Sequence, residues 1–178
     1  KNFYKSYLKF KGDHLPFVTA KMAVSKDFFT NNKKKKWITN IFSRSRVHLL
    51  RGKHDCILTS ARTIIKDNPR FTCRICGLEK NSPPLIVLDK NLMIPLSSKI
   101  IISARKNQTI IFFNKINEKK IKILKKLKVK IIRVPLSKDG DFNLKTILKK
   151  IKFLGFSRIF LESGLNLTTS FLKMSLID

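Results

Sequence analysis

A glutamate and a glycine follow an apolar run near the end of the chain, in the segment RIFLESGLNLTTSF (residues 158–171). The pattern predicts a buried strand that ends at Glu162, turns at Gly164 and enters a helix. Free N–H groups at a helix start attract phosphate, and a glycine there lets a phosphate approach closely. Glu162 could accept hydrogen bonds from sugar hydroxyls at the ligand-binding edge of a sheet. The segment therefore indicates either a sugar-phosphate site or an ordinary strand–helix turn with a lysine-paired glutamate.

A second polar group follows an earlier apolar run, in LTSARTIIKDNPRFTCR (residues 58–74). Thr63 and Asp67 are four positions apart, so they share one face of a helical turn. Arg74, and Arg51 at the end of the preceding predicted helix, could each bind a phosphate through two N–H groups. The alternative is a capped turn with solvated arginines. Neither a dinucleotide-binding G-x-G-x-x-G nor a Walker P-loop is present.

The cysteines favour a reducing compartment and no metal site. Three cysteines cannot make a paired disulfide framework. Cys73 and Cys76 form a CxxC, but no second CxxC or suitably spaced histidine pair completes a zinc site.

No apolar run reaches the roughly 18–20 residues that span a membrane, and the first residues lack the apolar core of a signal peptide. We therefore expect a cytoplasmic protein without a metal.

These candidate residues must be positioned by an α/β fold. Continuous apolar, β-branched runs alternate with helical patterns, as in sheets that helices cover on both faces. The chain of 178 residues is long enough for one such domain. We predict a mainly parallel sheet, with strands in residues 17–24, 56–60, 84–89, 99–103, 109–113, 129–134 and 158–163.

Three helices are predicted from periodicity, and a fourth is expected to end the chain. Apolar residues from Leu144 to Leu154 follow helical spacing, and Gly155 ends that helix. A lysine-coated helix is centred on residues 121–127. Thr39 is the predicted N-cap of a helix that runs through Arg51. Its inward residues are predicted to be Ile38, Ile41, Phe42, Leu49 and Leu50.

The net charge of +28 favours a polyanionic partner if taken alone. However, lysine, isoleucine, asparagine and phenylalanine are abundant all along the chain, which indicates a compositional bias. The lysines are spread over every predicted helix. We therefore expect no nucleic-acid partner, and the lysine run before the only tryptophan, KKKKWIT (residues 33–39), is interpreted as a loop.

Several motifs follow one another in the order, and near the spacing, of a known family. They are PFVTAKMAVSKD (16–27), KWIT (36–39), LLRGKHDCILTSARTIIKDNPRFTCR (49–74), PLIVLD (84–89), GDFNLKTILKKI (140–151) and IFLESGLNLTTSFLKMSLID (159–178). Together they resemble the reductase half of the bifunctional riboflavin-biosynthesis deaminase/reductase family. The resemblance covers nearly the whole chain from Pro16 onward.

The resemblance implies a dihydrofolate-reductase-like fold and NADPH-dependent reduction of 5-amino-6-(5-phosphoribosylamino)uracil to its ribitylamino product. Hydride would reach C1 of the sugar in its ring-opened imine form. Lys21 and Asp67 are the implied catalytic candidates, with Lys21 polarising or protonating the reacting centre. The implied cofactor residues are Ala23, Trp37, Thr63, Asp67, Gly164, Leu165 and Asn166. The implied substrate residues are Lys35, Arg51, Phe71, Arg74 and Glu162.

The chain departs from the family pattern in the segment between residues 26 and 36. Phe28 stands where the family has a glycine, and Lys35 where it has a substrate-contacting serine. The H-x-E and P-C-x-x-C motifs of the deaminase half are absent. We expect residues 1–15 to be a linker or the tail of a deaminase domain, and residues 16–178 to be a reductase domain that lacks its final strands. The family resemblance also implies a homodimer.

Two rival functions stay open on the sequence alone. A nucleic-acid-binding protein would show aromatic and basic residues together on one face and strongly salt-dependent binding. Another reductase on the same fold, acting on a pterin, would not need Arg51, Arg74 and Glu162 together. The choice between NADPH and NADH is also open, since Lys90 is the sole candidate for a 2′-phosphate contact.

Overall fold

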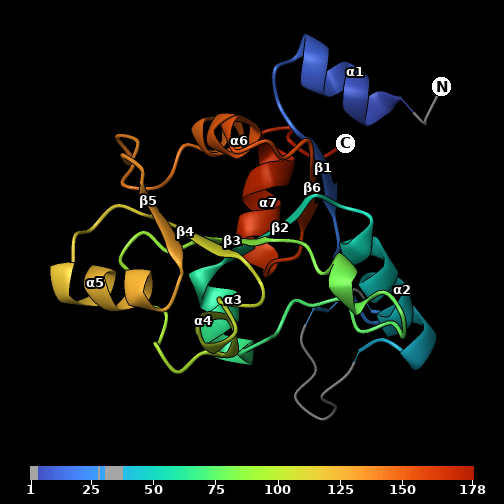
Figure 1. Ribbon diagram of the computed structural model, residues 1–178. Helices are drawn as coiled ribbons and strands as arrows, with labels where there is room; N and C mark the ends of the chain where they lie inside the picture. The colour runs from blue at the N-terminus through green and yellow to red at the C-terminus, as the bar shows by residue number, and fades with distance from the viewer. Residues whose placement is uncertain (1–3, 28, 31–37) are drawn as a thin grey trace.

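The computed structural model describes residues 4–27, 29–30 and 38–178, and its centre is a six-stranded sheet in which every pairing is parallel (Figure 1). The order across the sheet is β1-β6-β2-β3-β4-β5. The predicted α/β fold with a mainly parallel sheet is confirmed. The strands are β1 Phe17–Ala20, β2 Cys56–Ser60, β3 Leu85–Leu88, β4 Thr109–Phe113, β5 Lys130–Arg133 and β6 Arg158–Leu161.

Successive strand residues point to opposite sides of the sheet. Because these residues are apolar on both sides, helices cover both faces. Leu58 and Ile86 belong to the core beneath α6 and α7, while their neighbours Ile57 and Val87 face α3, α4 and α5. Figure 1 shows these two helical layers on either side of the strands, with α2 at one end. The helices are α1 Lys5–Gly12, α2 Ile41–Gly52, α3 Ala61–Asp67, α4 Lys99–Ile102, α5 Glu118–Lys126, α6 Leu144–Phe153 and α7 Leu165–Lys173, with a 3₁₀ turn at Glu79–Asn81.

The order of the strands identifies the edge of the sheet where ligands of such folds usually bind. The chain moves from β2 outward to β5 and then returns, so that β6 is inserted between β1 and β2. Ligands of open parallel sheets bind outside the carboxyl ends of the strands, at the point where the strand order reverses. Residues that follow β1, β2 and β6 are therefore brought to one edge.

Helix α6 forms as the sequence predicts. Asn143 caps it by accepting a hydrogen bond from the Thr146 N–H at 3.0 Å. Leu144, Ile147, Leu148 and Ile151 are buried. Gly155 has φ of +93°, the left-handed conformation that ends helices and that glycine adopts without strain.

One predicted strand is wrong. Residues 99–103 contain the helical turn α4, which buries Ile100 and Ile101 and leaves Ile102 68% exposed. Short apolar runs do not distinguish a strand from a buried helical turn by periodicity alone. The first and last strands are also shorter than predicted: β1 ends at Ala20 and β6 at Leu161.

The inward face of α2 differs from the predicted one. Asn40, rather than Thr39, is the N-cap, because its side chain accepts from the Ser43 N–H at 2.8 Å. Ile41 and Phe42 are 63% and 80% exposed. Leu49, also predicted to be inward, is 39% exposed. Leu50 packs on the core as predicted, together with Val47, and Arg51 is buried.

Helix α1 lies at the periphery, beside the end of the chain (Figure 1). None of its residues is buried, and Lys9 forms an ion pair with Asp178 at 2.6 Å. Among the described residues, no helix combines the length and the apolar character that a membrane crossing needs.

Candidate functional site

The carboxyl edge of the sheet gathers residues from three adjacent strands. Lys21 follows β1, and its backbone N–H donates to the Leu161 carbonyl at 3.0 Å, next to Glu162. The Glu162 N–H in turn donates to the Leu58 carbonyl of β2 at 3.0 Å. Thr63 lies in the first turn of the helix after β2. These three side chains, predicted from distant parts of the chain, thus originate at one edge of the sheet.

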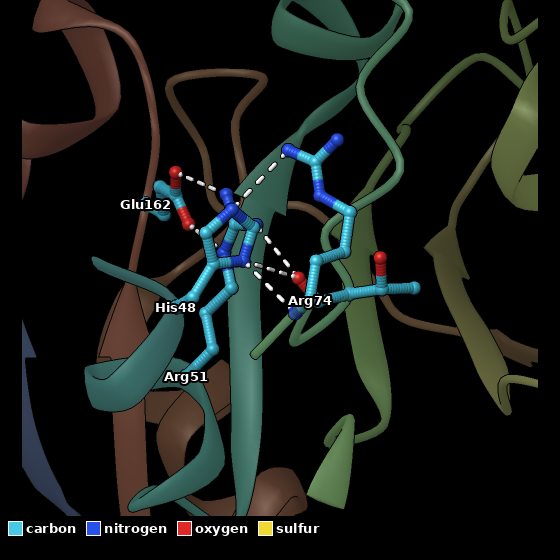
Figure 2. A network of polar contacts seen from close by, with 5 residues as sticks. His48, Arg51, Arg74 and Glu162 are labelled. Atoms are coloured by element: carbon cyan, nitrogen blue, oxygen red, sulfur yellow. Dashed lines mark hydrogen bonds and ion pairs between the residues drawn. The ribbon is translucent and has the colours of Figure 1, made fainter. Parts of the chain in front are cut away.

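Arg51 and Glu162 form a bidentate ion pair at this edge (Figure 2). Arg51 Nε donates to one carboxylate oxygen at 2.9 Å and Nη2 to the other at 2.8 Å. The two side chains are only 10% and 15% exposed. Paired N–H donors match a carboxylate in geometry, and the short distances are those of charge-assisted hydrogen bonds.

The segment 71–72 completes the surroundings of Arg51. The remaining terminal nitrogen of Arg51, Nη1, donates to the Thr72 carbonyl at 2.9 Å. The ring of Phe71 lies 5.6 Å from the guanidinium carbon, within reach of a cation–π contact. Phe71 is buried and has φ of +55°, which is uncommon for a bulky residue. This strained backbone conformation occurs where the Phe71 ring lies against the Arg51 guanidinium.

His48 lies between the two arginines, and no sequence motif pointed to it. Its Nδ1 is 2.9 Å from the Thr72 carbonyl, and its Nε2 is 3.3 Å from Arg74 Nη2 (Figure 2). Burial lowers the pKa of His48, and so do the positive charges of Arg51 and Arg74, against the opposing effects of the Thr72 carbonyl and Glu162. The available signal was its spacing, three residues before Arg51 on one helical face.

The turn into α7 contacts Thr63. The Gly164 N–H donates to Thr63 Oγ1 at 3.3 Å, and the Ser60 hydroxyl lies 3.2 Å from the same oxygen. Within the described part of the chain, no side chain caps the start of α7. The first N–H groups of a helix have no acceptor inside the helix, so this helix start is suited to an anion.

The other predicted residues are less constrained. Asp67 ends α3 on an exposed turn, one helical turn beyond Thr63. Ala23 is half-buried in the irregular segment after β1. Leu165 and Asn166 are exposed at the start of α7. Lys35 and Trp37 lie outside the described residues.

The CxxC pair lies in an irregular segment, with Cys73 buried and Cys76 exposed. In the part of the chain that the structure describes, no group of three or more His, Cys, Asp or Glu side chains could hold a metal ion. The polar network at the sheet edge consists of two arginines, a histidine, a carboxylate and the Thr72 carbonyl.

Comparison with known proteins shows one consistent family. The model of the family described as RibD C-terminal domain matches residues 16–178. The riboflavin biosynthesis protein RibD of Aquifex aeolicus is 39% identical over 165 residues, which cover 92% of this chain and 44% of that protein. The 2,5-diamino-6-ribosylamino-4(3H)-pyrimidinone 5′-phosphate reductase of Debaryomyces hansenii is 28% identical over 188 residues, covering 98% of this chain and 76% of that protein.

A solved structure of Acinetobacter baumannii RibD supports the fold. It superposes with a TM-score of 0.81 at 23% identity, over 98% of this chain and 47% of that one. The predicted dihydrofolate-reductase-like fold is thereby confirmed. The chain spans less than half the length of the RibD proteins named here.

Proposed function

Since this chain belongs to the RibD C-terminal domain family, we propose that it is a reductase of riboflavin biosynthesis. Its substrate is 5-amino-6-(5-phosphoribosylamino)uracil, its product is the ribitylamino compound, and its reductant is NADPH. The observation that carries this proposal is the Arg51–Glu162 pair with exposed Arg74 beside it, at the carboxyl edge of the sheet. A phosphorylated sugar requires both charges: a guanidinium for the phosphate and a carboxylate for hydroxyls.

The three charged residues have different tasks in this proposal. Arg74 is exposed, so its guanidinium can meet a phosphate from solvent. Arg51 already donates through all three of its nitrogens, to Glu162 and to Thr72. Arg51 therefore fixes the Glu162 carboxylate toward the substrate, and the phosphate is left mainly to Arg74. Phe71 keeps water from the back of Arg51.

The start of α7 fits a cofactor phosphate. The helix has no side-chain cap among the described residues, and its Gly164 N–H is held by Thr63. A Cβ built on Gly164 would meet only Thr63 Oγ1, at an ordinary 3.9 Å, so packing within the chain does not demand glycine there. A glycine with no packing reason suits close approach by a ligand. We assign Thr63, Gly164, Leu165 and Asn166 to the cofactor, with Asp67, Ala23 and Trp37.

When bound, the reduced nicotinamide supplies the hydride, and the chain orients the reacting carbons. Lys21 directly follows β1, and its backbone contacts β6 next to Glu162. Its side chain is proposed to polarise or protonate the reacting centre of the substrate. Asp67 shares a helical face with Thr63 and is proposed to orient the cofactor near that centre. NADPH is preferred to NADH on the family resemblance.

The extent of the functional unit is also a proposal. Residues 16–178 form the reductase domain, and residues 1–15, which contain α1, belong to a linker or a preceding domain. A homodimer is proposed from the resemblance. Reduction of a pterin on the same fold would leave the arrangement of Arg51, Arg74 and Glu162 without a purpose, so it is the less favoured function.

The proposal is tested by adding NADPH and following the fluorescence of Trp37 at low and high salt, and then adding the substrate and following NADPH oxidation. We expect quenching that survives high salt, and turnover with the phosphorylated substrate. A protein that ignores NADPH but binds an oligonucleotide in a salt-sensitive way would contradict the proposal and favour the basic-surface function.

A further inference from the structure

His48 joins the two arginines of the candidate substrate site, and its ring has a hydrogen-bond partner at each nitrogen (Figure 2). The carbonyl oxygen of Thr72, 2.9 Å from Nδ1, can only accept. Nδ1 must therefore carry the proton and donate it to Thr72. Nε2 of the same neutral ring then has a lone pair.

That lone pair faces a donor. Arg74 Nη2 lies 3.3 Å from Nε2, and a guanidinium nitrogen can only donate. The backbone N–H of Arg74 and the Nη1 of Arg51 approach Nδ1 at longer distances, 3.3 and 3.4 Å. Arg51 Nη1 has a better acceptor in the Thr72 carbonyl at 2.9 Å. Protonation at Nδ1 leaves the Arg74 backbone N–H without this acceptor, but it satisfies both the shorter Thr72 contact and the Arg74 Nη2 contact, whereas protonation at Nε2 would satisfy neither of them.

The surrounding charges favour this neutral ring. Arg51 faces it from the same helix, Arg74 from the segment after α3, and Glu162 from the end of β6. Burial and the two guanidiniums lower the pKa of His48, and this outweighs the Thr72 carbonyl and Glu162, which raise it. At neutral pH the imidazole is therefore an acceptor for Arg74. A protonated ring would place an N–H against a guanidinium.

We propose that His48 is a positioning residue, whose neutral Nε2 holds the Arg74 guanidinium in the orientation that binds the 5-phosphate of the substrate. The inference deepens the proposed function and rests on it for the identity of the ligand. Without the Nε2 acceptor, the exposed Arg74 side chain would lose its contact with His48 and its preferred orientation. Weaker binding of the phosphate group should follow, with hydride transfer itself little affected.

Two substitutions distinguish the role of Nδ1, which contacts Thr72, from that of Nε2, which contacts Arg74. His48→Asn keeps a donor near the position of Nδ1, for Thr72, and removes the acceptor for Arg74. His48→Gln reaches the position of Nε2 and can present a carbonyl oxygen to Arg74. We expect His48→Asn to raise KM for the phosphorylated substrate by roughly threefold to tenfold with kcat within about twofold, as loss of one hydrogen bond implies. His48→Gln should recover most of that loss.

Coupling to Arg74 distinguishes positioning from a general structural role. In an Arg74→Ala background, His48→Asn should change KM by less than about 1.5-fold, because the partner that it positions is gone. Equal KM values for the Asn and Gln variants, or undiminished effects in the Arg74→Ala background, would overturn the inference.

A measurement on the unaltered protein keeps the inference testable if a variant fails to fold. The nitrogen NMR shifts of His48 at neutral pH should report a neutral ring protonated at Nδ1, and they should move on titration with ribose 5-phosphate. A ring protonated at Nε2, a charged ring, or no response to ribose 5-phosphate would overturn it. If these signals respond as expected but NADPH reduces nothing, the proposed reaction fails and the role of His48 stands. If the protein reduces the substrate while the His48→Asn and His48→Gln variants behave alike, the proposed reaction stands and the role of His48 fails.

Discussion

Arg51 and Glu162 are 111 positions apart in the sequence and meet through two hydrogen bonds of 2.8 and 2.9 Å at the carboxyl edge of the sheet. Arg51 lies in the last turn of α2, and Glu162 directly follows β6, the strand inserted between β1 and β2. The pair therefore links the end of the last strand in the sequence to a helix at one end of the sheet. It also fixes the direction of a carboxylate at the edge proposed to bind the substrate.

Breaking this pair should cost stability as well as activity. Arg51→Ala would leave the Glu162 carboxylate, 15% exposed, without its charged partner. We expect a loss of about 2–4 kcal/mol in the free energy of unfolding, measured by urea denaturation. Arg51→Lys, which keeps the charge but not the paired N–H geometry, should lose about half as much. Equal stability of the Ala variant and the unaltered protein would contradict the role given to the pair.

The contact between Thr63 and Gly164 should control cofactor affinity. Thr63→Val keeps the shape of the side chain and removes the acceptor for the Gly164 N–H. We expect NADPH to bind roughly fivefold more weakly, as for one lost hydrogen bond, in a fluorescence titration. Thr63→Ser keeps the hydroxyl and serves as the matched control. A loss in the Ser variant with none in the Val variant would contradict this, because it would show that the methyl group, and not the hydroxyl, matters.

Asp55 should make stability depend on pH in the acidic range. Burial would raise the pKa of its carboxyl, but hydrogen bonds from the Ser157 hydroxyl and N–H and from the Arg158 N–H outweigh burial and lower it. A carboxyl with a lowered pKa in the folded state stabilises the protein above its unfolded pKa, about 3.9. That contribution is lost as pH falls through the folded pKa. Asp55→Asn should flatten the fall in thermal stability below about pH 4; an unchanged slope would contradict this.

The sequence was informative where local rules govern the fold. Continuous apolar runs predicted the buried strands, and helical spacing with Gly155 predicted the start and end of α6. It misled where a short run fits two structures, as in α4, and where the exposed Ile41 and Phe42 of α2 were expected inside. Helical periodicity alone does not say which apolar stripe meets the sheet.

The site residues were partly predictable from the order of the motifs along the chain, and not from local rules of folding. The order of the motifs indicated Arg51, Arg74 and Glu162 as a group, but pairing of specific atoms across the fold is not encoded in any local pattern. His48 was missed because a single histidine carries no motif, and only the folded chain brings Thr72 and Arg74 to its two nitrogens.

The most direct test of the phosphate site is a comparison of two arginines in one segment. Arg74 contacts His48 at the candidate site, whereas Arg70 is an exposed arginine with no role in it. Steady-state kinetics should show that Arg74→Ala raises KM for the phosphorylated substrate about tenfold or more, with kcat little changed, as for a lost charge-assisted contact. Arg70→Ala should stay within about twofold of the unaltered protein, since exposed charges contribute little. Unchanged KM in the Arg74→Ala protein, or equal losses in both, would contradict a sugar-phosphate site at this edge of the sheet.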